Sequence, residues 1–267
     1  MPACKLCAAE TAPFGEQLVL GRHRAAYRRC TACGYVFVEN PHWLDEAYAS
    51  SAIAALDTGI VHRNLWLADT VAALLALRFR GVGRCLDYGG GGGLFVRLLR
   101  DRGYDFRWQD RHCPNLFARG FEAGDDERFD LITCFEVVEH LVDPLVTFDA
   151  LAARAPTLVF ATELLPATAN RPGEWHYYAP QTGQHVGFFT RASLEGVARR
   201  LGRHLASDGR RLHVIATRPI GDRLLRLLAR KRWARRLARR FDRRPPLTWS
   251  DAALLEQRLL TPRRPAP

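Results

Sequence analysis

The 267-residue chain shows neither a long apolar run nor an apolar N-terminus, so we expect no segment that directs it into or across a membrane. It has no run of eighteen or more apolar residues, so no membrane-spanning helix is expected. Its first ten residues contain two cysteines and no apolar core, which is unlike a signal peptide. We therefore expect a cytoplasmic protein.

Lysine is nearly absent: Lys5 and Lys231 are the two in a chain with 39 Lys and Arg residues. The net charge of +11 is also unevenly distributed. Between Asp222 and Arg244, eleven Arg or Lys stand against two Asp, a local charge of +9, and the remainder is close to neutral. Basicity is thus a property of the C-terminal tail, and a GC-rich genome is a partial explanation of the arginine excess.

Cysteine is sparse, but four of the seven cysteines form two CxxC pairs: Cys4, Cys7, Cys30 and Cys33. In a chain without an export signal, such pairs are more often metal ligands or redox sites than disulfides. Two pairs separated by twenty-two residues match a tetrahedral zinc ribbon, with a hairpin closing the loop between them. We predict structural Zn²⁺ here. Iron in a rubredoxin-like site and a redox pair are the alternatives.

No internal repeat is visible, and composition divides the chain into four regions. Apolar residues make up 48% and charged residues 25%, as in globular proteins. Between residues 81 and 218, short apolar runs alternate with amphipathic stretches, which predicts βαβ units and an α/β fold. The predicted regions are a cysteine module at 1–40, a helical lead-in at 41–80, an α/β domain at 81–218 and an arginine-rich helical tail at 219–267.

A glycine-rich loop follows the first predicted strand of the α/β domain. The strand at 84–87 leads into five glycines at 89–93, and an amphipathic helix begins directly afterwards. In this arrangement a ligand can approach backbone N–H groups at the N-terminus of a helix. A flexible linker would not stand between a buried strand and an amphipathic helix.

The spacing Asp87-x-Gly89-x-Gly91-x-Gly93 resembles the D/E-x-G-x-G-x-G signature of class I S-adenosylmethionine (SAM) dependent methyltransferases. The resemblance implies a doubly wound, Rossmann-like sheet with SAM as cofactor, the loop against its methionine part and Asp87 in contact with it. Asp110 ends a strand-like run twenty-three residues after Asp87, where the family binds the ribose hydroxyls. An exposed aspartate in a turn is the alternative for Asp110.

A second stretch, 129–144, resembles the family's fourth strand and the loop after it. The resemblance implies that Glu136 lines the cleft for cofactor and substrate. Glu139 and His140 are expected to tie this helix to the scaffold. For His140, catalysis is the alternative, and we favour the structural role. The nineteen residues between Asp110 and Asp130 are too few for the usual helix and third strand, so this connection is expected to be abbreviated.

The segment 174–189 resembles the W-x-Y-x-x-P-x-x-G-Q-H-x-x-F stretch of the methyltransferase-23-like subgroup, which also carries an N-terminal cysteine module. Histidine suits the role of a base near neutral pH, and both His185 and His176 are candidates. We favour His185 because it follows Gly-Gln in the subgroup pattern. In the alternative, the aromatic residues pack at the sheet edge and His185 forms a hydrogen bond within the loop.

The tail predicts a basic amphipathic helix at 223–241, a break at Pro245-Pro246 and a second short helix. Three interpretations of the basic helix are open. It docks on the domain with a solvated basic face, lies on an anionic membrane surface, or binds a phosphate-bearing partner.

Together these features predict a SAM-dependent methyltransferase acting on a small-molecule or glycan-like acceptor. Deoxysugar C-methyltransferases also combine a cysteine module with this fold, but extend well beyond this chain. One alternative is a nucleic-acid-binding or nucleic-acid-modifying protein that binds its target through the zinc ribbon and the basic tail. We do not favour it, because an N/D-P-P-Y/F signature is missing after the fourth strand. The other alternative is a catalytically silent scaffold, which the intact glycine loop disfavours.

Overall fold

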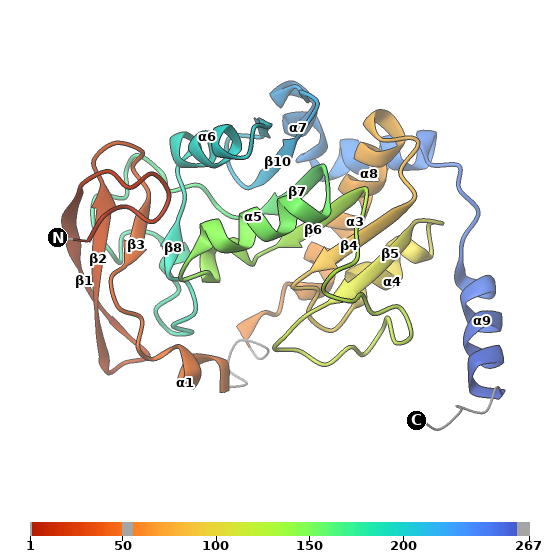
Figure 1. Cartoon of the computed structure of the whole chain (residues 1–267), viewed down its shortest axis with the longest axis horizontal. Helices are drawn as coiled ribbons and strands as arrows, with labels where there is room; N and C mark the ends of the chain where they lie inside the picture. Colours follow the sequence, from red (N-terminus) through yellow and green to blue (C-terminus); the bar gives the residue numbers. More distant parts are fainter. Residues whose placement is uncertain (1, 50–55, 261–267) are drawn as a thin grey trace.

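The computed structural model describes residues 2–49 and 56–260, which form two β-sheets with surrounding helices (Figure 1). The N-terminal sheet has the strand order β1-β2-β3-β8, and the central sheet has the order β5-β4-β6-β7-β10-β9. The first sheet lies at the left end of Figure 1, and helix α9 lies at the opposite end.

The central sheet confirms the predicted doubly wound α/β class. Strands β4 (Arg84–Tyr88), β5 (Asp105–Gln109), β6 (Leu131–Phe135) and β7 (Thr157–Ala161) are parallel. Strand β10 (Leu212–Ala216) runs antiparallel to both β7 and the edge strand β9 (His204–Ser207). The chain passes from β4 to β5 on one side and then to β6 on the other. The carboxyl end of β4 is therefore a topological switch point, where open α/β sheets bind ligands.

Alternate residues of the strands enter two different cores, as the two-residue period of a strand requires. Cys85 and Leu131 face the core under helices α3 (Ile60–Arg78), α4 (Leu94–Arg100) and α7 (Asp222–Leu228). Leu86 and Ile132 face the core under α5 (Pro144–Arg154) and α6 (Arg191–Arg200). The sheet is thus covered by helices on both faces, and the strands β6, β7 and β10 are buried nearly throughout.

The lead-in forms α1 (Leu44–Ala49) and α3, with residues 50–55 outside the described part. Within the described residues, α3 is the one helix long and apolar enough to cross a membrane. Half of its apolar window is buried inside the protein, and the residues from Trp66 to Leu75 supply much of the larger core. Its composition therefore fits a core helix.

The cysteine module contributes three antiparallel strands: β1 (Thr11–Val19), β2 (His23–Cys30) and β3 (Val36–Val38). The fourth strand, β8 (Gly187–Phe188), comes from the distant predicted α/β region and pairs with β3. Tyr35 and Phe37 reach into the same core as α5. The module is therefore joined to the central domain by both a shared sheet and a shared core.

The prediction of one helix at 223–241 is wrong, because the chain forms α7 and then α8 (Lys231–Phe241) with a break at residues 229–230. The break lets both segments bury an apolar side, Leu225 and Leu228 in α7 and Ala234 and Ala238 in α8. Both helices join the core that contains α3, so the tail is docked on the domain.

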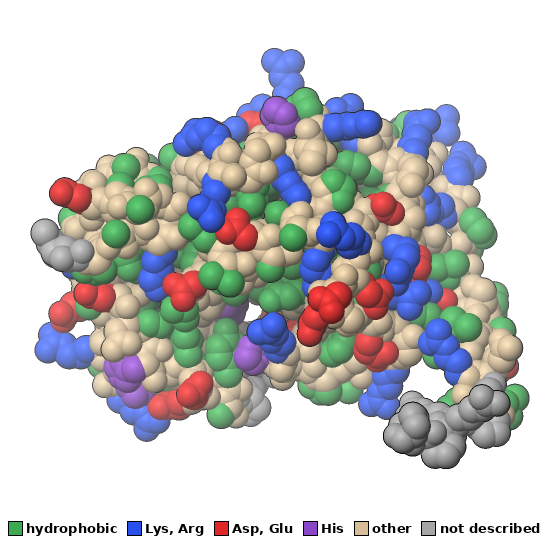
Figure 2. Space-filling model, viewed as in Figure 1, with side chains coloured by type: hydrophobic (Ala, Val, Ile, Leu, Met, Phe, Trp, Pro, Cys, Tyr) green, Lys and Arg blue, Asp and Glu red, His purple; other side chains and the backbone are tan. Residues whose placement is uncertain are grey.

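The basic face of α8 is left toward solvent. Figure 2 shows Lys and Arg side chains over the upper right of the molecule, where α8 lies in Figure 1. The exposed cations of this helix are Lys231, Arg232, Arg235, Arg236, Arg239 and Arg240.

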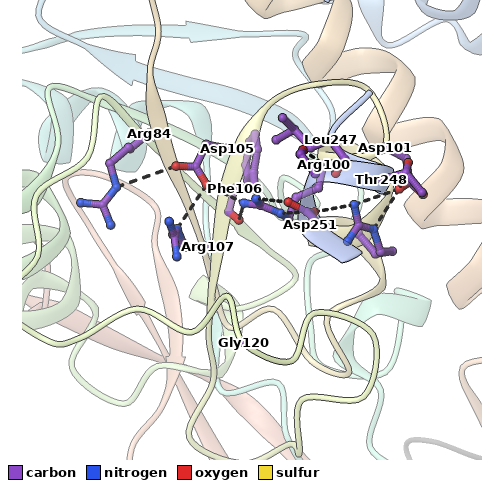
Figure 3. Close-up of polar contacts among 12 residues, drawn as sticks. Arg84, Arg100, Asp101, Asp105, Phe106, Arg107, Gly120, Leu247, Thr248 and Asp251 are labelled. Atoms are coloured by element: carbon purple, nitrogen blue, oxygen red, sulfur yellow. Dashed lines mark hydrogen bonds and ion pairs between the residues drawn. The ribbon is translucent and has the colours of Figure 1, made fainter. Parts of the chain in front are cut away.

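Helix α9 (Thr248–Leu260), the predicted second helix of the tail, is held by a buried ion pair (Figure 3). The carboxylate of Asp251 accepts hydrogen bonds from Nε and Nη2 of Arg100 at 2.8 and 2.7 Å. The same guanidinium lies 3.8 Å from the ring centre of Phe121. Leu247 and Thr248 add hydrogen bonds to Arg100 and Asp101. The start of α9 is thereby fixed to the end of α4.

The connection between β5 and β6 is abbreviated, as predicted. Residues 111–130 are all described and contain no α-helix. The third strand of the usual fold is reduced to a single parallel bridge between Trp108 and Glu122. The edge of the sheet beside β5 is consequently covered by a loop.

Candidate functional site

The glycine loop turns sharply at the carboxyl end of β4. Gly89, Gly91 and Gly93 have φ values of +68°, +52° and +84°, the left-handed region that favours glycine. A Cβ at Gly89 would overlap Val137, and one at Gly93 would lie 2.7 Å from Oδ1 of Asn115. At Gly91 a Cβ would meet no atom within 4 Å. Two of these glycines therefore permit close packing, whereas Gly91 borders open space.

Two residues of the neighbouring strand end hold Gly91 in place. Nε1 of Trp108 donates to the Gly91 carbonyl at 2.8 Å, and the Gly91 N–H donates to Oδ2 of Asp110 at 2.9 Å. The other oxygen of Asp110 accepts from the N–H groups of His112 and Cys113. The structure thus brings Asp110 to the glycine loop. Sequence reasoning missed Trp108, although an aromatic residue two positions before the acidic one is a visible signal.

Asp87 lies beneath the loop and is 3% exposed. Its carboxylate accepts a hydrogen bond from Oγ1 of Thr133 on β6 at 2.7 Å. Burial raises the pKa of Asp87 to about 7, because removing a carboxylate from water disfavours its charged form. Asp87 therefore faces inward, between β4 and β6.

Two carboxyl groups follow β6 at the other side of the switch point. Glu136 has a φ of +55°, a left-handed conformation that costs a non-glycine residue about 1–3 kcal/mol. Glu139, in the short helix η1 (Val138–His140), is fully buried. Burial raises the pKa of Glu136 to about 8, with a contribution from Glu139, and that of Glu139 to about 7. The hydroxyl of Tyr177 donates to Glu139 and lies 3.5 Å from Oε2 of Glu136.

The structure brings His185, but not His176, to these carboxyl groups. Nδ1 of His185 lies 2.6 Å from the Tyr177 carbonyl, and its ring packs edge-on against His140 with centres 4.8 Å apart. Burial lowers the pKa of both His185 and His140, which favours neutral rings. His176, in η2 (His176–Tyr178), has a 73% exposed side chain and lies 3.5 Å from Glu163. The contact between His185 and the Tyr177 carbonyl lies within the loop 174–189. It is the hydrogen bond expected if His185 has a structural role rather than that of a base.

Other elements reach this site without any local sequence signal. Tyr48 of α1 stacks on His112 with ring centres 4.5 Å apart and also contacts His140. Arg63 near the start of α3 bonds to Asp57 at 2.9 Å and opposes the rise in the pKa of Glu136. These side chains come from the lead-in, which sequence reasoning treated only as a helical segment.

The four cysteines of the module converge, with all Sγ atoms within 4.8 Å of one another. Sγ of Cys4 lies 3.8 Å from that of Cys33, and Sγ of Cys7 lies 3.5 Å from that of Cys30. A disulfide requires about 2.05 Å, whereas tetrahedral Zn–S bonds of about 2.3 Å place the sulfurs roughly 3.8 Å apart. The N–H groups of Leu6 and Cys33 point at Sγ of Cys4 and Cys30. The donor set therefore fits a tetrahedral thiolate site.

Comparison with known proteins places the chain among methyltransferases. The family model described as a methyltransferase domain matches residues 61–207. A solved structure of TnmH is 18% identical with a TM-score of 0.47, over 67% of this chain and 62% of TnmH. An O-methyltransferase family protein from Burkholderia thailandensis is 14% identical with a TM-score of 0.49, over 64% of this chain and 62% of that protein.

A further solved structure shows CalO1, a methyltransferase in calicheamicin biosynthesis, with SAH bound. It is 16% identical with a TM-score of 0.46, over 66% of this chain and 61% of CalO1. The chain thus spans less than two thirds of the length of each of these three proteins. No curated protein matches the sequence. Because the matched family model covers more than half of the chain, the protein belongs to this methyltransferase-domain family.

Proposed function

We propose that the protein transfers a methyl group from SAM to a small-molecule or glycan-like acceptor. The observation that carries this proposal is the position of Gly91. It borders open space at the switch point, is held by Asp110 and lies at the same edge of the sheet as Glu136. The proposed cofactor-binding residues are Asp87, Gly89, Gly91, Gly93, Asp110 and Glu136.

The chemistry of these residues suits the parts of SAM. A glycine loop has no side chains, so the methionine part of SAM can lie close to its backbone. A carboxylate accepts hydrogen bonds from the two hydroxyls of a ribose. Asp110 uses Oδ2 for one N–H group, so a lone pair of that oxygen is available. When bound, SAM supplies an electrophilic methyl group on a sulfonium sulfur.

The buried groups after β6 suit the acceptor. The acceptor atom forms its bond to the methyl carbon as the carbon–sulfur bond breaks. The electron pair stays on sulfur, and the acceptor gives up a proton. His185 is the proposed base: the Tyr177 carbonyl can only accept, so Nδ1 carries the hydrogen and Nε2 presents a lone pair. Holding both reactants in a dry cleft supplies much of the rate.

The same proposal assigns structural Zn²⁺ to Cys4, Cys7, Cys30 and Cys33. Support comes from the tetrahedral sulfur spacing and from the two N–H groups directed at sulfur. With four protein ligands the site is closed, which is typical of structural rather than catalytic zinc.

Calorimetric titration of S-adenosylhomocysteine into the zinc-loaded protein tests the cofactor site. We expect saturable binding in the micromolar range and at least a tenfold loss in Asp110→Ala, because both the ribose acceptor and the support of Gly91 disappear. Asp126→Ala removes an exposed carboxylate of the same connection and should bind like wild type. Folded, zinc-loaded wild type that does not bind would overturn the proposal and favour the silent scaffold or the nucleic-acid alternative.

A further inference from the structure

A second cluster of metal-ligating side chains lies outside the cysteine module. Glu139, His140 and His185 each present one ligand atom, and these atoms lie within 4.8 Å of one another. The residues come from η1 and from the loop before β8, which the chain brings together from 45 positions apart.

Two polar atoms of this cluster are buried and lack a hydrogen-bond partner: Oε2 of Glu139 and Nδ1 of His140. A buried polar atom left unpaired costs about 1–3 kcal/mol, so native proteins rarely tolerate two side by side. A cation between them would satisfy both.

The remaining hydrogen bonds are those expected around metal ligands. A metal-binding histidine usually donates its other N–H to a carbonyl or carboxylate, which fixes the tautomer. His185 does so through Nδ1 to the Tyr177 carbonyl, which leaves the lone pair on Nε2. Oε1 of Glu139 accepts from the Tyr177 hydroxyl, which leaves Oε2 for a further partner. One residue, Tyr177, therefore orients two of the three ligands.

We propose that Glu139, His140 and His185 bind one divalent transition-metal ion. Two imidazoles and one carboxylate suit Mn²⁺, Fe²⁺, Co²⁺ or Zn²⁺, and three protein ligands leave coordination positions open. The carboxylate of Glu136, placed near Tyr177, lies beside the cluster. The cation offsets the free-energy cost of burying the charge of Glu139. In the described structure the hydrogen bond of this carboxylate comes from the Tyr177 hydroxyl and not from a basic side chain.

This inference, taken with the proposed function, narrows the acceptor. A cation at this position favours an acceptor hydroxyl with a neighbouring oxygen, such as a catechol or a sugar diol, over a carbon acceptor. It also lowers the pKa of a bound hydroxyl. With a metal on Nε2, His185 is a ligand, and this inference replaces the base role that the proposed function gives it. The neighbouring cation favours the ionised form of Glu136. Glu136 then takes the acceptor proton as the oxygen–methyl bond forms and the carbon–sulfur bond breaks, with the electron pair left on sulfur.

Titration of Mn²⁺ into the full chain loaded with one Zn²⁺ per chain, which fills the cysteine module, tests the site. Binding is measured as the loss of the free Mn²⁺ signal in electron paramagnetic resonance. Mn²⁺ is the probe because it prefers oxygen and nitrogen over thiolates, which leaves the cysteine module undisturbed. We expect one Mn²⁺ per chain. Affinity should fall at least tenfold in His185→Ala and in the isosteric Glu139→Gln. His176→Ala, which removes the exposed histidine of the same loop, should bind like wild type.

No Mn²⁺ binding by wild type, or equal binding by folded His185→Ala and Glu139→Gln, overturns the site. The S-adenosylhomocysteine titration on the same samples separates this inference from the proposed function. Cofactor binding without Mn²⁺ binding rejects only the metal site. Mn²⁺ binding without cofactor binding supports the metal site and rejects the proposed function.

Discussion

Asp87 places a carboxyl group under the glycine loop with one hydrogen bond, from Thr133. An ionised carboxylate in this position lacks the solvation that the unfolded chain would give it. The pKa of about 7 in the folded chain therefore stands well above the value of about 4 expected in the unfolded chain. Its charge state and the stability of the domain are linked.

Between about pH 4 and 7 the folded chain keeps a proton on Asp87 that the unfolded chain has lost. The contribution of Asp87 to the unfolding free energy is therefore fully present below pH 4 and falls as pH rises toward 7. Urea denaturation should show that the unfolding free energy falls between pH 5 and 7.5 in both proteins. The fall should be about 2–3 kcal/mol smaller in Asp87→Asn than in wild type. Part of the decline should persist, because Glu136 also has a raised pKa. An Asp87→Asn variant with the wild-type pH dependence would contradict this account.

The motif residues of the site could be predicted one by one, because each lies at a fixed spacing from a strand end. Asp87, Asp110 and Glu136 lie at neighbouring strand ends of one sheet. Trp108 and Tyr177 could not be assigned roles, because their partners depend on how the loops fold back. The proposed roles of the motif residues in binding and catalysis stay predictions.

At the scale of elements, the strands were the most predictable part. The sequence predicts all four parallel strands: β4, β6 and β7 from short apolar runs and β5 from a strand-like run that ends at Asp110. The break between α7 and α8 was not predictable, since Ala229 and Arg230 carry no glycine or proline signal. Tertiary packing decides it, because a straight helix could not bury the apolar sides of both segments.

The docking of α9 also depends on a long-range contact. Asp251 and Arg100 are 151 residues apart in sequence, and their side chains are 6% and 5% exposed. Breaking a buried pair leaves an uncompensated charge and costs about 3–5 kcal/mol, although Arg100 keeps a second carboxylate, Asp105.

We therefore expect Asp251→Ala to lower the unfolding free energy by about 2–4 kcal/mol and to release α9. Limited proteolysis should cut the chain between α8 and α9 faster than in wild type. The matched control is Asp149→Ala, which breaks a pair with Arg200 whose side chains are 43% and 52% exposed, and should leave the unfolding free energy nearly unchanged. Equal cleavage rates in the two variants would show that the ion pair does not hold α9.

At the scale of the whole molecule, the cysteine module and the proposed reaction site are connected through backbone hydrogen bonds. The N–H of Val38 donates to the Val186 carbonyl at 2.9 Å, and the N–H of Val186 donates to the Glu139 carbonyl at 2.8 Å. Val186 lies between His185 and strand β8. The module therefore helps to position two of the three proposed metal ligands.

Loss of zinc should accordingly affect the reaction site more than the cofactor site. Cys30→Ser should lose the zinc and several kcal/mol of stability, because a structural metal couples binding to folding. We expect Mn²⁺ affinity to fall at least tenfold and S-adenosylhomocysteine affinity to change less than threefold. Cys113→Ser, at an exposed cysteine outside the cluster, should keep one zinc per chain. Full retention of Mn²⁺ affinity without zinc would refute the proposed coupling.

The basic face of α8 borders a cavity of about 620 Å³ between α3 and α8, lined by Arg232, Arg235 and Arg239 among others. These three arginines are exposed. An anionic membrane surface or a phosphate-bearing partner stays a prediction for this face, as does a cytoplasmic location for the protein.

Strand β8 belongs to the N-terminal sheet, although in sequence it lies between elements of the central domain. The N-terminal sheet therefore cannot be exchanged as a continuous segment of the chain. A chimera that exchanged residues 1–40 for those of another methyltransferase would leave Gly187 and Phe188 facing a foreign β3. The side chains of Val36 and Phe188, which are paired in register and completely buried, would then have to change together. Any successful graft must therefore carry both pieces, and inherited variation at these two positions should be correlated among close homologues.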